Sequence, residues 1–245
     1  MNLKIFETPG ELGQYAGKLT AEYLNKAIKE RGEARLVVST GMSQFETLEA
    51  LRGADVDWSK VTMFHLDEYI GLDETHKASF VKYLKERFTG FLPKMKAHYV
   101  DGTKNPEDVI KKLTEEINKA PVDIALIGIG VNAHVAFNDP PADFDTKESY
   151  IVVKLDNVCK EQQVGEGWFA TVADVPDIAL TMTVHKVMQS KAIISAVPHA
   201  VKADAVYNTV NREVTNTVPA TILKNHPDWT LCVDKNSASK LEKTP

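Results

Sequence analysis

Side chains able to exchange protons follow an apolar run near the middle of the chain. Ile124 to Ile127 has the length and composition of a strand buried on both faces, and Gly128 and Gly130 end it. Within the next ten positions come four polar residues: Asn132, His134, Asn138 and Asp139. A carboxylate can fix the tautomer of an imidazole that acts as acid and base, so Asp139 is expected to orient His134. The alternatives are a hydrogen-bonded loop histidine and two asparagines that serve as turn residues with positive φ.

A pair of adjacent carboxylates, Asp67 and Glu68, follows a second apolar run, Val61 to Leu66. The end of a buried strand fixes where one of the two carboxylates points. That carboxylate could act as a base if partial desolvation raised its pKa toward neutrality. The alternatives are a helix cap or a surface ion pair.

Two further segments could hold an anion. Residues 39–43 (STGMS) form a short turn between an expected strand and an expected helix, where free backbone N–H groups favour phosphate and the hydroxyls of Thr40 and Ser43 add donors. Lys202 is expected in the first turn of a later helix, where a cation is unfavourable unless an anion lies beside it. The alternatives are that Ser43 caps its helix and that Lys202 is an exposed surface lysine.

The elements that must position these residues alternate along the chain. Strands are expected at residues 3–6, 34–39, 61–66, 98–100, 123–128, 150–155, 192–197 and 229–233. Helices are expected at residues 9–31, 44–52, 79–89, 106–119, 181–189 and 199–210, whereas the glycines of residues 164–169 favour a loop. This alternation predicts an α/β fold with a mostly parallel sheet covered on both faces, in a single domain spanning residues 1–245.

Composition excludes several classes of function. The net charge of −5 and the absence of a basic cluster argue against nucleic-acid binding. Cys159 and Cys232 have no metal-like spacing, so neither a metal site nor a disulfide is expected. The N-terminal residues are not expected to form a signal peptide, because they carry charge at once and lack an apolar core, and no apolar run is long enough for a membrane span. We therefore expect a cytoplasmic protein without membrane contact.

The sequence contains four motifs, T-G-x-S at 40–43, LDEYIGL at 66–72, GIGVNAHVAFNDP at 128–140 and VPATIL at 218–223. Together they resemble glucosamine-6-phosphate deaminase (isomerase), a family in the same superfamily as 6-phosphogluconolactonase, and the similarity extends over residues 35–235. The resemblance implies a Rossmann-like three-layer αβα sandwich and a reaction without metal or cofactor. It also implies a small-molecule partner, an amino-sugar phosphate, which is glucosamine 6-phosphate in the leading interpretation. Monomer and homo-oligomer both remain open.

The resemblance also implies roles for matching residues. Asp67 is implied as the base that moves a proton between C2 and C1, and His134 as the group that assists ring opening. Asp139 would orient His134, and Asn132 lies at a position where members carry Asp or Asn. The phosphate would be held by Thr40, Gly41, Ser43 and Lys202.

The chain departs from the family pattern at three places. Asp139 replaces a Glu, so its contact with His134 is expected to be reorganised or bridged by water. Met42-Ser43-Gln44 replaces Gly-Thr-Pro in the phosphate loop, and residues 165–169 lack the family's phosphate-binding Arg. Some members of the family bind an allosteric activator, but the residues that bind it have no counterpart in this sequence, so no such site is expected.

The alternatives in function are a deaminase acting on galactosamine 6-phosphate, a 6-phosphogluconolactonase and a non-catalytic sugar-phosphate sensor. Residues 140–170 are expected to include any lid over the site, because this connection is long and contains glycines.

Overall fold

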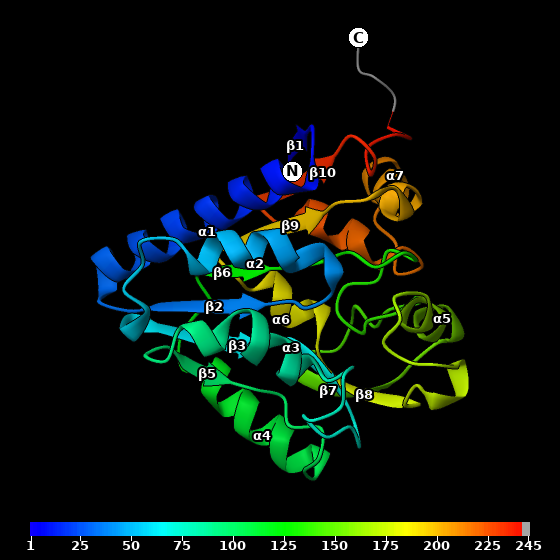
Figure 1. Ribbon diagram of the computed structural model, residues 1–245, viewed down its shortest axis with the longest axis horizontal. Coiled ribbons are helices and arrows are strands. Elements are labelled where there is room, and N and C mark those ends of the chain that lie inside the picture. Colours follow the sequence, from blue (N-terminus) through cyan, green and yellow to red (C-terminus); the bar gives the residue numbers. More distant parts are fainter. Residues whose placement is uncertain (242–245) are drawn as a thin grey trace.

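The computed structural model describes residues 1–241 and contains two sheets flanked by helices (Figure 1). The strands are β1 (Asn2–Phe6), β2 (Ala34–Val38), β3 (Val61–His65), β4 (Asp67–Tyr69), β5 (Lys96–His98), β6 (Ile124–Leu126), β7 (Tyr150–Lys154), β8 (Ile178–Met182), β9 (Ala192–Val197) and β10 (Trp229–Asp234). The α-helices are α1 (Pro9–Arg31), α2 (Phe45–Arg52), α3 (Phe80–Arg87), α4 (Pro106–Ile117), α5 (Asn157–Gly165), α6 (Val184–Met188) and α7 (Ala203–Asn211). Within the described residues, none of the helices is long and apolar enough to cross a membrane.

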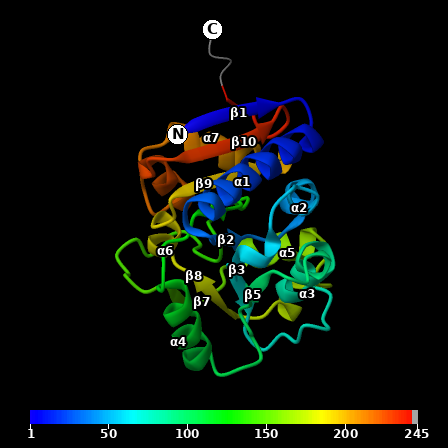
Figure 2. The same cartoon turned by 90° about the vertical axis from the view of Figure 1, so that its left-hand side faces the viewer.

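The main sheet has seven strands in the order β1-β10-β9-β6-β2-β3-β5, and every neighbouring pair is parallel. Helices cover both of its faces, as the two views of Figures 1 and 2 show. The predicted three-layer α/β fold with a mostly parallel central sheet is therefore confirmed. Because all seven strands run in one direction, their carboxyl ends meet along one edge, where such sheets bind ligands.

The central strand β6 shows how the two apolar layers arise. Ile124 and Leu126 point into the core beneath α1, α2 and α3, whereas Ala125 and Ile127 point into the core beneath α4, α6 and α7. All four side chains are fully buried. The continuous apolar run is thus the signature of a strand covered on both faces, as predicted.

The first helix begins and ends where the sequence indicates. The Thr8 side chain accepts a hydrogen bond from the Glu11 amide, and Pro9 occupies the first turn. Gly32 closes the helix in the left-handed region at φ 82°, a conformation that glycine adopts without steric cost.

The second sheet, in the order β4-β8-β7, was not predicted as a sheet, and its pairs are antiparallel. The predicted helix over residues 181–189 is wrong in its first half, because residues 178–182 form β8 and the helix α6 begins only at Val184, after Thr183 caps it. The predicted loop at 164–169 is wrong at its start, since α5 continues to Gly165. Strand β5 lies two residues earlier than expected.

Strand β8 joins the two segments that carry the acid–base residues. On one side it pairs with β4, with Asp67 opposite Thr181. The loop after β6 is bonded to the same strand, because the Thr181 hydroxyl accepts a hydrogen bond from the Phe137 amide at 3.1 Å and Asn138 Nδ2 donates to the Met182 carbonyl at 2.9 Å. The end of β3 and the loop after β6 are therefore fixed relative to each other by buried polar contacts.

We predict that Thr181→Val lowers the free energy of unfolding by about 1–3 kcal/mol, because the buried Phe137 amide loses its acceptor. The measurement is chemical denaturation. Thr20→Val is the matched control, since Thr20 is equally buried and its hydroxyl only donates to the Ala16 carbonyl within α1. Equal losses in the two variants would contradict the role given to Thr181.

Candidate active site

The candidate site lies at the carboxyl ends of four adjacent strands of the main sheet, β9, β6, β2 and β3. Each of these strands is followed directly by a segment that lines a single pocket. The pocket contains Asp67, His134, Thr40, Gly41, Ser43 and Lys202, so six of the eight predicted site residues come together there. The remaining two, Asn132 and Asp139, lie behind His134 and contact each other.

Asp67 is the buried carboxyl of the pocket, with 6% of its surface exposed. Burial and the neighbouring charge of Glu68 hold its pKa well above the usual value. A carboxyl with a raised pKa binds a proton more readily than an ordinary aspartate. The interpretation of Asp67 as a candidate base is supported, and the surface ion pair is not observed for it.

Glu68 points away from the pocket, because successive side chains of a strand face opposite sides. Its carboxylate accepts hydrogen bonds from the Ser79 hydroxyl and the Val81 amide at the start of α3, each at 2.9 Å, and from the Tyr69 amide at 3.0 Å. Burial nevertheless raises the pKa of Glu68 to about 7. One carboxylate of the pair is thus a helix-capping group and the other belongs to the site.

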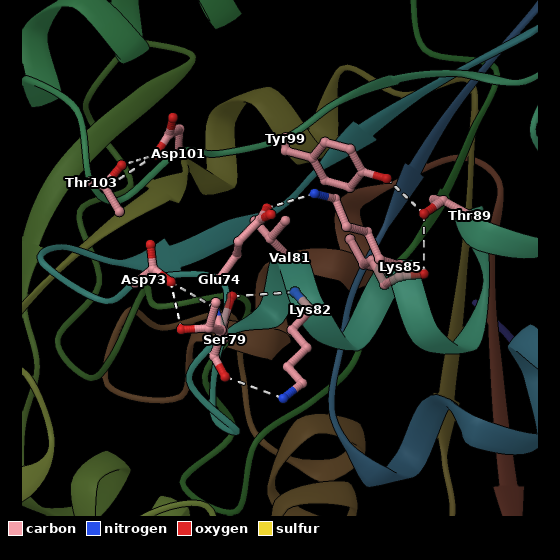
Figure 3. Close-up of polar contacts among 12 residues, drawn as sticks. Asp73, Glu74, Ser79, Val81, Lys82, Lys85, Thr89, Tyr99, Asp101 and Thr103 are labelled. Atoms are coloured by element: carbon pink, nitrogen blue, oxygen red, sulfur yellow. Dashed lines mark hydrogen bonds and ion pairs between the residues drawn. The ribbon is translucent and has the colours of Figure 1, made fainter.

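The surroundings of this cap form a polar network on the side away from the pocket. Figure 3 shows Ser79 at the start of α3 with its contact to Lys82, the ion pair of Glu74 with Lys85, and the contact of Thr89 with Tyr99. These contacts anchor α3, and with it Phe80, which lines the pocket.

His134 is placed by a glycine and by Asp139. A Cβ atom at Gly130 would lie 2.2 Å from His134 Nε2, so the absence of a side chain there leaves room for the ring. His134 Nδ1 lies 3.0 Å from Asp139 Oδ1, which in turn accepts from Asn132 Nδ2 at 3.2 Å. The shorter aspartate therefore lies within ion-pair distance of the imidazole, although the two groups are not aligned for a hydrogen bond. The expected reorganisation of this contact relative to the family's Glu stays a prediction.

The charge of Asp139 is stabilised although it is buried. Burial alone would raise its pKa, but the contacts with His134 and Asn132 outweigh burial and hold the pKa below the usual value. The residues with positive φ in this loop are Ala133 and Ala136, so the asparagines are not the left-handed turn residues that the alternative proposed. Asn132 holds Asp139, and Asn138 holds the loop against β8.

The turn after β2 depends on the backbone conformation of Gly41 and on a hydrogen bond from a side chain of α3. Gly41 has φ 101° and ψ 165°, a conformation that favours glycine. Its carbonyl accepts a hydrogen bond from the buried Tyr83 hydroxyl at 2.8 Å. The Ser43 hydroxyl accepts from Gln44 Nε2 at 3.0 Å and makes no helix-capping bond, so the capping alternative is wrong.

Lys202 lies at the boundary between a short 3-10 turn, Ala200–Lys202, and α7. It is buried, with 6% of its surface exposed, so the alternative of a surface lysine is also wrong. Burial lowers the pKa of its ammonium group, and the charge of Glu166 partly offsets this effect. A buried ammonium group beside a turn with free hydroxyls is suited to hold an anion.

Several pocket residues were not predicted, and most of them belong to α5 or follow it. They are Gln162, Gln163, Glu166, Trp168 and His199. Glu166 accepts from Gln162 Nε2 at 2.7 Å and from Trp168 Nε1 at 3.0 Å, and Gln162 Oε1 accepts from the Val131 amide at 3.3 Å. Figure 1 shows α5 beyond the ends toward which β2 and β9 point. Two features of the sequence could have indicated these pocket residues: the length of the 140–170 connection and the position of His199 just after a strand.

The arrangement can bind an anionic ligand at one end and move protons at the other. A carboxyl of raised pKa and an imidazole backed by a carboxylate are two separately placed acid–base groups in the same pocket. Such a pair suits reactions in which one group acts on a carbon-bound proton and the other on an oxygen.

We predict that Glu68→Gln lowers the pKa of Asp67, because it removes the neighbouring negative charge that disfavours the Asp67 anion. Carbon NMR titration of the side-chain carboxyls measures this. Glu74→Gln serves as the control, since Glu74 is an exposed partner of Lys85 and does not face Asp67. An Asp67 pKa that stays the same or rises in Glu68→Gln would refute the assignment.

Comparison with known proteins finds relatives that match nearly the whole chain. Residues 7–232 match the family model described as glucosamine-6-phosphate isomerases/6-phosphogluconolactonase. A glucosamine-6-phosphate deaminase of Thermoanaerobacter pseudethanolicus is 32% identical over 91% of this chain and 89% of its own length. Another, from Lacticaseibacillus paracasei, is 31% identical over 99% of this chain and 100% of its own.

Solved structures show the same fold. A monomeric glucosamine-6-phosphate deaminase superposes with a TM-score of 0.88 at 27% identity, covering 98% of this chain and 99% of that one. A 6-phosphogluconolactonase of Thermotoga maritima superposes with a TM-score of 0.79 at 16% identity, covering 96% and 99% of the two chains, a likeness of fold alone. The chain therefore belongs to the family of glucosamine-6-phosphate isomerases and 6-phosphogluconolactonases.

Proposed function

We propose that the protein is a glucosamine-6-phosphate deaminase, which converts glucosamine 6-phosphate and water to fructose 6-phosphate and ammonia. The observation that carries the proposal is the buried carboxyl of Asp67, with its raised pKa, in one pocket with His134 and the anion-binding turn. The curated relatives that bear this name, at 31% and 32% identity, support it.

The phosphate group is assigned to the end of the pocket that contains Thr40, Gly41, Ser43 and Lys202. Backbone N–H groups and hydroxyls of the turn donate to the phosphate oxygens, and the Lys202 ammonium group compensates their charge. Because this group does not react, its binding energy serves to place the sugar carbons against the acid–base residues.

His134 opens the sugar ring. It transfers a proton from the C1 hydroxyl to the ring oxygen O5, which breaks the C1–O5 bond and leaves an aldehyde at C1. Asp139 and Asn132 keep the imidazole in the orientation for this transfer. A stably charged Asp139 is suited to this role, since it favours the imidazole that carries a proton on Nδ1.

Asp67 moves the proton that converts the aldose to a ketose. Its carboxylate takes the proton from C2 while the C1 carbonyl oxygen gains a proton from the ammonium group of the substrate, which gives a C1–C2 enolamine. Asp67 then returns its proton to C1, which gives a protonated imine at C2. Water adds to that carbon, and ammonia leaves with formation of the C2 ketone. A base with a raised pKa is matched to this step, because it must both accept and release the proton.

The alternatives fit the site less well. A lactonase hydrolyses an ester and needs no base facing a carbon-bound proton, which leaves the buried Asp67 unexplained. A non-catalytic sensor needs neither Asp67 nor His134. A preference for galactosamine 6-phosphate, the oligomeric state, a cytoplasmic location and the single-domain organisation stay predictions.

Purified protein incubated with glucosamine 6-phosphate is expected to release ammonia and fructose 6-phosphate in equal amounts. Asp67→Asn should reduce turnover about 10²–10⁴-fold while sugar-phosphate binding is retained, because the amide cannot take the C2 proton. Coupled assays measure the two products, and calorimetry with fructose 6-phosphate measures binding.

Asp73→Asn is the matched control, since Asp73 is an exposed loop residue outside the pocket. Lactonase activity without product from any amino-sugar phosphate would overturn the proposal. Near-normal turnover in Asp67→Asn would remove Asp67 from the base role.

A further inference from the structure

A cysteine that the proposed reaction does not use lies beside the acid–base residues. His134 Nδ1 or Nε2, an Asp139 carboxylate oxygen and Cys159 Sγ all lie within 4.8 Å of one another. Cys159 reaches this position from the first turn of α5, which Asp156 caps by accepting a hydrogen bond from the Cys159 amide at 2.6 Å. The cluster therefore joins α5 to the loop that follows β6.

Two atoms of this cluster are buried without a satisfied hydrogen bond. They are His134 Nδ1, which lies 3.0 Å from Asp139 Oδ1 without hydrogen-bond alignment, and Asp139 Oδ2. The side chains are 13% and 8% exposed, and Cys159 is fully buried. Buried polar atoms without partners are rare in folded proteins, so these two require a physical explanation.

The chemistry of the three donors suits a thiophilic divalent cation. Imidazole nitrogen, carboxylate oxygen and thiolate sulfur are all zinc ligands, and three protein ligands leave a fourth position open. Zinc–ligand bonds of about 2.0–2.3 Å place the donor atoms of a tetrahedral site roughly 3.3–3.8 Å apart. The donor atoms of this cluster lie within 4.8 Å of one another, so they need to approach by at most about 1 Å to bind the ion together.

The charge balance also suits a cation. On binding, the cation displaces the thiol proton to solvent, and the thiolate and Asp139 carboxylate together neutralise its two positive charges. The pocket lined by His134, Gln162 and Gln163 provides the route from solvent.

We propose that His134, Asp139 and Cys159 form a binding site for Zn²⁺ and chemically similar cations, and that such an ion inhibits the enzyme. Inhibition rests on the proposed function, because the ion would bind the His134 nitrogen and the Asp139 carboxylate that the reaction requires. Cation binding itself does not depend on that function.

Cadmium is the probe, because a cadmium–thiolate bond has its own ultraviolet absorption. The full-length protein is expected to bind one equivalent of Cd²⁺ with this absorption, and Zn²⁺ should compete for the site and suppress ammonia release. Cys159→Ser is expected to lose the absorption. The matched control is Cys232→Ser, which removes the other buried cysteine, in β10, and should retain it.

A second variant keeps the test decisive if Cys159→Ser fails to fold. Asp139→Asn retains the thiol but removes a charged ligand, so it should weaken cadmium binding by more than about tenfold. The site is refuted if the folded wild type shows no cadmium–thiolate absorption, or if both variants bind as the wild type does. Undiminished turnover with Zn²⁺ fully occupying the site would refute the inhibition. If the metal-free protein released no ammonia, only the proposed function would be refuted.

Discussion

The site depends on buried polar contacts that hold two distant segments against one strand. Asp67 lies in β4, which pairs with β8, and the loop that carries His134 is bonded to the same strand through the Phe137 amide and Asn138. Asp67 and His134 are 67 positions apart in the sequence, yet both are fixed relative to Thr181 and Met182. An acid–base pair requires this rigidity, because a displacement of about 1 Å can cost 10²-fold in rate.

Two aspartates of the site have pKa values shifted in opposite directions, and this difference supports the roles proposed for them. Asp67 faces the pocket beside another carboxylate, and its pKa is raised; Asp139 contacts an imidazole and an amide, and its pKa is lowered. In the proposed mechanism the first exchanges a proton with the substrate, and the second stays charged and orients His134. Glu68 contributes to this difference through its charge while its own hydrogen bonds hold the start of α3.

The sequence was sufficient for the main sheet and for residues that immediately follow its strands. Apolar runs and helix caps locate β2, β3, β6 and β9, and their carboxyl ends supply Asp67, His134, Thr40 and Lys202. In the second sheet, β7 was expected as a strand, but part of β8 was predicted as the start of a helix. Residues 179–182 are all buried, and a short buried run cannot be distinguished from a helical segment by its periodicity alone. The pocket residues of α5 were missed for another reason. Gln162, Glu166 and Trp168 bond to one another locally, but this segment joins the pocket through tertiary structure, such as the contact of Gln162 with the Val131 amide.

The central claim is that Asp67 carries a proton from C2 to C1 of the sugar. Glucosamine 6-phosphate labelled with deuterium at C2 tests it most directly. The account predicts slower turnover of the labelled substrate and recovery of part of the deuterium at C1 of fructose 6-phosphate. Equal rates for labelled and unlabelled substrate, with no deuterium at C1, would contradict it.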